Sequence, residues 1–307
     1  MSAVNTEGKK YPSIGSFYNA DIRNNGTPRR VTEAMKRMGM GVCGFKRYTR
    51  PMEENEISKH DLHLFLDDGR DDIEWLPPKP NACWLVDTHL GFEQRLEWAR
   101  KFDTVFVAQK EAVSLLEAEG IEKVFWLPLA CSPYLDPDYK SLQKHFGREK
   151  DLTRIYDCAF VGYLNRGVEK DKESHDRVLF LDHVYKKFPN SWLAFNLFFE
   201  EAAVRYVRAR VGLNISIKHD LNMRFFEALS YGVCQVCNRD MEGWSELGFV
   251  EGEDFLGFET LDEACEKIQW ALDNPSEREK IAESGMAKVR ASHTYADRIR
   301  KLLSLAL

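Results

Sequence analysis

The sequence predicts an α/β protein built from two doubly wound domains, each a mostly parallel sheet covered by helices. Short apolar stretches of strand length alternate with stretches of helical length in both halves of the chain, which is the pattern of repeated βα units. A polar, charged connector over residues 133–152 separates the halves. The length of 307 residues exceeds what one compact core usually holds, which favours two domains.

The first half begins with a strand at residues 13–18 and a helix at 27–39. Thr27 is predicted to cap this helix, Pro28 to open it and Gly39 to end it. The other apolar stretches predict four strands and one helix: strands at 62–66, 82–86, 104–108 and 124–127, and a helix at 110–120.

The same alternation restarts after the connector. Strands are predicted at 155–162, 211–216 and 233–237, and helices at 175–188, 200–209 and 222–231. Gly232 ends the last of these helices. The predicted parts are a first domain at 1–138, a linker at 139–152, a second domain at 153–290 and a C-terminal helix at 291–307 that packs back on the first domain.

Composition and charge exclude several classes of protein. Hydrophobic residues make up 44% of the chain and charged residues 30%, too apolar a balance for a disordered protein. The net charge of -6 supplies no positive field for non-specific nucleic-acid binding. No run of about 18 apolar residues is present, and the polar start lacks the apolar core of a signal peptide. We therefore expect a cytoplasmic protein without a membrane span, whose oligomeric state stays open.

The seven cysteines are scattered through apolar segments and predict reduced core thiols rather than disulfides. Cys234 and Cys237 have the spacing of a redox or zinc motif. They lie inside a predicted strand, with no second pair and no nearby histidine cluster, so the core interpretation is favoured.

The most informative segment follows the strand at 211–216, where a polar loop leads into a helix that starts near Asn222. Main-chain amides at a helix start favour a diphosphate. Cationic charge from Lys218, His219 and Arg224 would add to them, and Glu227, one turn on, can accept hydrogen bonds from ribose hydroxyls. The alternative is a capped amphipathic helix on which Arg224 and Glu227 form a solvated pair.

Four segments resemble glycosyltransferases related to the spore-maturation CgeB group. They are NMRFFEALSYG at 222–232, DCAFVGYLNR at 157–166, and the tail segments DNPSER at 273–278 and SHTYADR at 292–298. The resemblance implies a GT-B fold, in which two Rossmann-like domains face a central cleft and the second domain binds a nucleotide-sugar donor. It assigns the ribose to Glu227 and the diphosphate to Arg224 or Lys218. The sequence departs from the commoner family pattern at Asp220, where that pattern has a glutamate.

Further donor-site candidates come from the same resemblance and from their position after strands. They are Gly162, Tyr163, Arg166, Asn222 and Met223. Gly162 ends a predicted strand, where the absence of a side chain lets the backbone approach a phosphate, or where the chain simply turns.

The first half supplies the candidates for acid–base chemistry and for the acceptor. Asp87 and His89 directly follow a strand, where a histidine can take a proton and a carboxylate can orient it, although a turn or a cap is as common at such a place. Asp67, after another strand, is interpreted as a turn residue. Acceptor-binding candidates lie in the loop after the first strand: Asn19, Asp21 and Arg23.

The predicted function is transfer of a sugar from a nucleoside-diphosphate sugar to an acceptor, which is a glycan, a protein, a nucleic-acid base or a small molecule. Positive protein charge would stabilise the leaving diphosphate, so neither a metal nor any cofactor beyond the donor is expected. Two alternatives stay open: a non-catalytic module that binds a nucleotide sugar or a glycan, and a nucleotide-sugar epimerase.

Overall fold

The computed structural model describes residues 12–18, 26–40, 42–45, 60–67, 76–146, 152–162 and 172–307. The chain divides into two compact units. Unit 1 comprises Met1–Leu129 and Tyr295–Leu307, and unit 2 comprises Ala130–Thr294. The sequence predicts that the first domain ends at residue 138 and that the C-terminal helix begins at residue 291. In the structure, unit 1 ends its first segment at Leu129 and resumes at Tyr295.

Unit 1 contains a parallel sheet of six strands in the order β2-β1-β3-β4-β5-β6. The strands are β1 (Ile14–Phe17), β2 (Val42–Phe45), β3 (Leu62–Leu66), β4 (Asn81–Leu85), β5 (Thr104–Val107) and β6 (Val124–Trp126). The side chains of β1, β3, β4 and β5 are buried throughout, as expected of strands covered on both faces.

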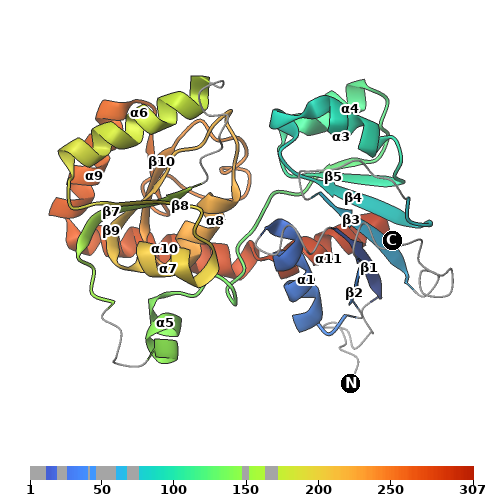
Figure 1. Cartoon of the computed structure of the whole chain (residues 1–307), viewed down its shortest axis with the longest axis horizontal. Coiled ribbons are helices and arrows are strands. Elements are labelled where there is room, and N and C mark those ends of the chain that lie inside the picture. The colour runs from blue at the N-terminus through green and yellow to red at the C-terminus, as the bar shows by residue number, and fades with distance from the viewer. Residues whose placement is uncertain are drawn as a thin grey trace. The chain divides into compact units, whose positions relative to one another are not determined.

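Helices cover both faces of this sheet (Figure 1). They are α1 (Thr27–Arg37), the short 3-10 helix η1 (Thr88–Leu90), α3 (Phe92–Ala99), α4 (Glu111–Ala118) and α11 (Tyr295–Ala306). Leu96 of α3 and Leu116 of α4 share one hydrophobic core with the sheet. The C-terminal helix α11 joins unit 1, where Arg298 Nε donates to the carbonyl of Pro128 over 2.8 Å.

The ends of α1 show how the sequence sets helix boundaries. The helix begins at Thr27, and its N-cap is Gly26, with no side-chain cap hydrogen bond, so the prediction that Thr27 caps the helix was wrong. Gly39 follows the helix with φ of 70°, a left-handed conformation that glycine adopts without strain. The predicted stop at Gly39 is confirmed.

Unit 2 contains a parallel sheet of five strands in the order β11-β10-β9-β7-β8. The strands are β7 (Tyr156–Gly162), β8 (Trp192–Phe195), β9 (Ala209–Asn214), β10 (Cys234–Asn238) and β11 (Leu256–Phe258). Both units are thus doubly wound α/β sheets, as predicted.

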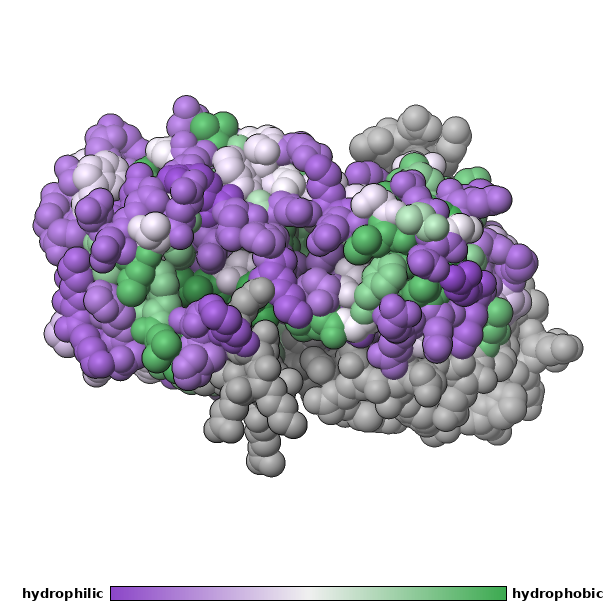
Figure 2. Space-filling view, turned by 90° about the horizontal axis from the view of Figure 1, so that it is seen from above, coloured by the Kyte–Doolittle hydropathy of each residue, from purple (hydrophilic) through white to green (hydrophobic). Residues whose placement is uncertain are grey.

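The helices of unit 2 are α5 (Tyr139–Phe146), α6 (Lys172–Lys187), α7 (Phe199–Val207), α8 (Met223–Ser230), α9 (Leu261–Asp273) and α10 (Pro275–Ser292). Apolar side chains of α6 and α9 pack on one face of the sheet, and those of α7 and α8 pack on the other (Figure 1). Helix α5 lies inside the stretch predicted as a connector, and its Leu142 is buried against α7. The face of the molecule drawn in Figure 2 is largely hydrophilic, as expected where amphipathic helices turn apolar residues inward.

The sheet of unit 2 has a topological switch point, the place where the strand order reverses direction, between β7 and β9. From β7 the chain passes to β8 on one side and then crosses to β9 on the other. In open parallel sheets, ligands bind beyond the carboxyl ends of the strands at such a point. The strands that flank it end at Gly162 and Asn214, and the loops after them are where a ligand is expected.

The six cysteines whose side chains the structure describes are buried free thiols. Burial raises the pKa of the Cys158 and Cys234 thiols to about 12, which keeps them protonated and unreactive. The prediction of reduced core thiols is confirmed for these six. Within the described part of the chain, no helix is long and apolar enough to cross a membrane.

Candidate functional site

The start of α8 is fixed by a pair of asparagines. Asn222 is the N-cap, and its Oδ1 accepts from the main-chain N–H of Phe225 over 3.1 Å, the usual contact of an N-cap residue. The side-chain amides of Asn222 and Asn214 also approach each other, with two N···O separations of 3.2 Å. Asn214 is buried at the end of β9. This pair ties the helix start to the carboxyl end of the strand.

Glu227 and Arg224 lie one turn apart on α8 and form an ion pair. Arg224 Nη1 is 2.7 Å from Glu227 Oε2, and their side chains are 17% and 2% exposed. Phe225, Phe226 and Leu229 face the core, as predicted. The pair itself was also predicted, but as a solvated pair, and this detail was wrong because the carboxylate is buried. Burial of a carboxylate is costly unless partners satisfy it.

The loop before α8 contains the other cationic candidates. Lys218 and His219 both have positive φ, 51° and 55°, a conformation that is uncommon outside glycine. Both side chains are exposed, and His219 Nδ1 lies 3.0 Å from Asp240 Oδ2. Asp220, the departure from the family pattern, accepts through its carbonyl from the hydroxyl of Ser216. The loop is thus closed by its own hydrogen bonds.

Gly162 ends β7 at the switch point. A Cβ at this position would lie 2.5 Å from Phe160 Cζ, so the ring of Phe160 fills the space that a side chain would take. Glycine is required here by that ring, a reason that the sequence did not reveal. Tyr163 and Arg166, the two candidates that follow, lie outside the described residues, as do Asn19, Asp21 and Arg23 of the acceptor prediction.

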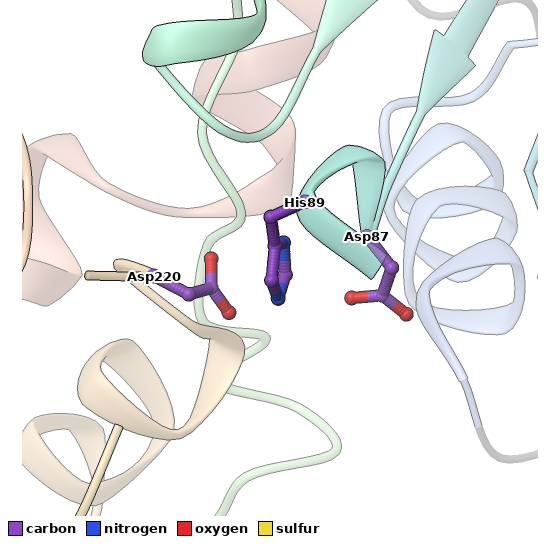
Figure 3. A group of neighbouring side chains, drawn as sticks. All are labelled: Asp87, His89 and Asp220. Atoms are coloured by element: carbon purple, nitrogen blue, oxygen red, sulfur yellow. The ribbon is translucent and has the colours of Figure 1, made fainter. Parts of the chain in front are cut away.

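Asp87 and His89 lie in unit 1, in the turn where the chain leaves β4 and enters η1 (Figure 3). Asp87 is left-handed, with φ of 54°, and occupies the N-cap position of η1 without a side-chain cap hydrogen bond. A carboxylate oxygen of Asp87 and a ring nitrogen of His89 lie within 4.8 Å of each other. Both side chains are half-buried. The structure thus brings together the two residues predicted to share acid–base chemistry.

Three buried polar residues hold this turn, and sequence reasoning gave none of them this role. Gln109 Oε1 accepts from the main-chain N–H and the hydroxyl of Thr88, over 3.2 and 3.0 Å. Asp67 Oδ2 accepts from Val86 N–H and from Arg95 Nε, each over 3.1 Å. Asp67 is therefore half of a buried ion pair, while the turn predicted from Asp67 onward falls on residues that the structure does not describe. Its position after a buried strand was the available signal, but its partner Arg95 is distant in sequence.

Tyr206 and Asn214 are the residues of unit 2 that sequence reasoning missed. The guanidinium carbon of Arg224 lies 5.8 Å from the centre of the Tyr206 ring, within the range of a cation–π contact. Asn214 gave one usable signal, a polar side chain at the end of an apolar strand. Tyr206 gave none, because a tyrosine on an amphipathic helix is ordinarily a core residue.

The arrangement in unit 2 combines a switch point, a helix start, a buried carboxylate and a guanidinium. A carboxylate accepts hydrogen bonds from a pair of hydroxyls, and a guanidinium donates to phosphate oxygens in a planar fork. Both groups come from one turn of α8. The site therefore suits a nucleotide.

The two doubly wound units match the fold of GT-B glycosyltransferases. By sequence, residues 177–304 match the family described as glycosyl transferase-like. This segment runs from α6 through α11 and contains the whole of α8. No curated protein matches the chain by sequence.

Solved structures similar to this chain share its fold at low sequence identity. An α-glucosyltransferase in complex with UDP and a 13-mer DNA containing an HMU base superposes with a TM-score of 0.63 and 9% identity, over 96% of this chain and 99% of that one. Sucrose-phosphate synthase from Thermosynechococcus elongatus gives 0.60 and 13%, over 96% and 98%. Anabaena Alr3699/HepE in complex with UDP and glucose gives 0.56 and 11%, over 96% and 100%.

Proposed function

We propose that this protein is a glycosyltransferase that moves a sugar from a nucleoside-diphosphate sugar to an acceptor. The observation that supports it most is the buried Glu227 carboxylate paired with Arg224 at the start of α8, inside the segment that matches the glycosyl transferase-like family. The finer resemblance to the spore-maturation CgeB group is part of the same proposal.

The candidate residues in and around α8 have distinct roles in this proposal. Glu227 binds the ribose hydroxyls, and Arg224 stabilises the diphosphate as it leaves, when its negative charge is largest. Lys218, on the exposed loop before α8, adds positive charge. Asn222 acts by holding the helix start in place. In unit 1, His89 takes the proton of the acceptor hydroxyl and Asp87 orients the ring.

Transfer without a metal ion is part of the proposal. Arg224, Lys218 and the helix dipole of α8 supply the positive charge that a divalent cation provides elsewhere. We expect turnover in excess EDTA to equal turnover without it. Restoration of activity by Mg²⁺ or Mn²⁺ after EDTA treatment would contradict this part alone.

A two-stage experiment tests the function. Thermal unfolding is first followed with UDP, GDP, ADP and dTDP, because a ligand of the native state raises its stability by mass action. UDP leads the panel because structures similar to this chain contain it. Release of the free diphosphate from the matching nucleotide sugar is then measured with and without pools of glycans, proteins, DNA and small alcohols.

The outcomes separate the candidate functions. Release that depends on an acceptor supports transfer. Binding without release in any pool supports the non-catalytic module, and conversion of the donor sugar without an acceptor supports the epimerase. If no member of the panel shifts the unfolding temperature, the donor-site assignment in unit 2 fails.

A further inference from the structure

The strands that flank the switch point of unit 2 separate before they end. β7 and β9 pair at Cys158 with Val211 and at Ala159 with Gly212, and the pairing stops there. On its other side β7 stays paired through Gly162, and β9 stays paired through Asn214. The two strand ends thus form a fork, and the fork opens at the place where ligands bind in this topology.

The hydroxyl of Tyr206 bridges this fork. It accepts from the main-chain N–H of Val161 on β7 and donates to the carbonyl of Leu213 on β9, each over 3.2 Å. Tyr206 is fully buried, and burial raises the pKa of its hydroxyl, so the group stays protonated and able to donate. It satisfies two buried main-chain groups that the separated strands would otherwise leave unpaired.

The neighbours of Tyr206 are shaped to its ring. A Cβ at Gly212 would lie 2.8 Å from Val233 Cγ1 and 3.2 Å from two ring carbons of Tyr206, so a side chain there would crowd both residues. Tyr231, just after α8, stacks on it with a centroid separation of 5.4 Å and an interplanar angle of 24°. Arg224 lies over the same ring, 5.8 Å from its centre. One side chain of α7 thus contacts both strand ends and the guanidinium of α8.

We propose that Tyr206 is a positioning residue of the donor site. Its hydroxyl sets the spacing of the β7 and β9 ends, and its ring orients Arg224 toward the diphosphate. This inference rests on the proposed function, because it needs a nucleotide bound next to α8. It assigns Tyr206 no contact with the donor, so the effect of Tyr206 on binding passes through the fork and through Arg224.

Two substitutions separate the two contacts. Tyr206→Phe keeps the ring and removes the bridge, and Tyr206→Leu removes both. We expect Tyr206→Phe to weaken binding of the diphosphate about tenfold, and Tyr206→Leu to weaken it further. Tyr156→Phe is the matched control, because Tyr156 lies at the other end of β7, where its ring packs on Trp192. The control is expected to bind as the wild type does.

A double-mutant cycle tests whether Tyr206 acts through Arg224. Dissociation constants are measured by calorimetry for Tyr206→Phe, Tyr206→Leu and each of these combined with Arg224→Ala, with whichever of UDP, GDP, ADP or dTDP gives the largest thermal shift. Both variants at position 206 lack the bridge, so they differ only in the aromatic ring, and far-ultraviolet circular dichroism verifies that each protein is folded. If the ring orients Arg224, the change from Phe to Leu at position 206 weakens binding while Arg224 is present and alters it by less than about threefold once Arg224 is replaced by alanine.

The results distinguish this inference from the function on which it rests. A ring that is purely structural would give the same loss from Phe to Leu at position 206 with and without Arg224, and this would overturn the inference while the donor site stands. Wild-type affinity in folded Tyr206→Phe would overturn the role of the bridge. If the wild type binds none of the four diphosphates, the proposed function fails and the positioning role fails with it.

Discussion

Arg224 and Glu227 neutralise each other within one turn of α8, with 2.7 Å between Nη1 and Oε2. A nucleotide that uses both residues must offer each of them a new partner. Ribose hydroxyls and diphosphate oxygens match the two groups in hydrogen-bonding character. The ion pair therefore keeps the two side chains close together in the absence of a donor. Arg224→Ala and Glu227→Gln each break it from one side.

Arg224→Ala should lower kcat by about 10²–10³-fold, the usual cost of losing one transition-state charge contact, while affinity for the bare nucleoside changes little. The reason is that negative charge on the diphosphate grows as the glycosidic bond breaks. Arg224→Lys is the control, since it retains the charge without the planar fork, and it should recover part of the rate. Steady-state kinetics and nucleoside dissociation constants, measured for both variants, test this prediction. A loss confined to nucleoside binding would place Arg224 elsewhere in the site.

Asn222→Ala should lower the free energy of unfolding by about 1 kcal/mol, because α8 loses its cap, and it should also weaken binding of the diphosphate. The matched control is Thr260→Ala, which removes the cap of α9, where the threonine Oγ1 accepts from Glu263 N–H over 3.2 Å. That variant should lose similar stability and keep its affinity. Chemical denaturation measures the stability of both variants, and calorimetry measures their affinity for the diphosphate. If Asn222→Ala binds the diphosphate as tightly as Thr260→Ala and the wild type do, Asn222 matters only for folding.

His89→Ala should lower turnover by about 10²–10⁴-fold, the range for loss of a general base, and leave binding of the diphosphate unchanged. Asp87→Asn should lower turnover without unfolding unit 1, because asparagine tolerates the left-handed conformation that position 87 adopts. Calorimetry with the diphosphate accompanies the kinetics. Loss of nucleotide binding in both variants would argue against a donor site confined to unit 2.

The elements that the sequence predicted well are those with strong local signals. The strand at 62–66 coincides with β3, and Gly232 follows α8 with φ of 74°, because apolar runs and helix-ending glycines act locally. β2 and α3 were missed. β2 has only four residues and includes Gly44, and α3 is only eight residues long. Neither element is long enough to show a clear hydrophobic periodicity.

The candidate site was predictable to the extent that it lies on one helix. Arg224 and Glu227 are three residues apart, so their proximity follows from helical geometry alone. Arg95 and Asp67 meet across 28 residues, and Tyr206 reaches β7 across 45. These contacts depend on how strands are ordered in the sheet, which local patterns do not specify.

The assignment of the ribose to Glu227 is the central claim, and one calorimetric comparison tests it most directly. Wild type and Glu227→Gln are each titrated with the diphosphate that binds best and with its 2′,3′-dideoxy analogue. Hydrogen bonds to a charged group are worth about 1.5–3 kcal/mol, so Glu227→Gln should cost roughly tenfold in affinity for the natural diphosphate. The analogue lacks both hydroxyls and should bind wild type and variant almost alike. If the analogue binds wild type as tightly as the natural diphosphate does, Glu227 does not hold the ribose and the donor-site assignment is wrong.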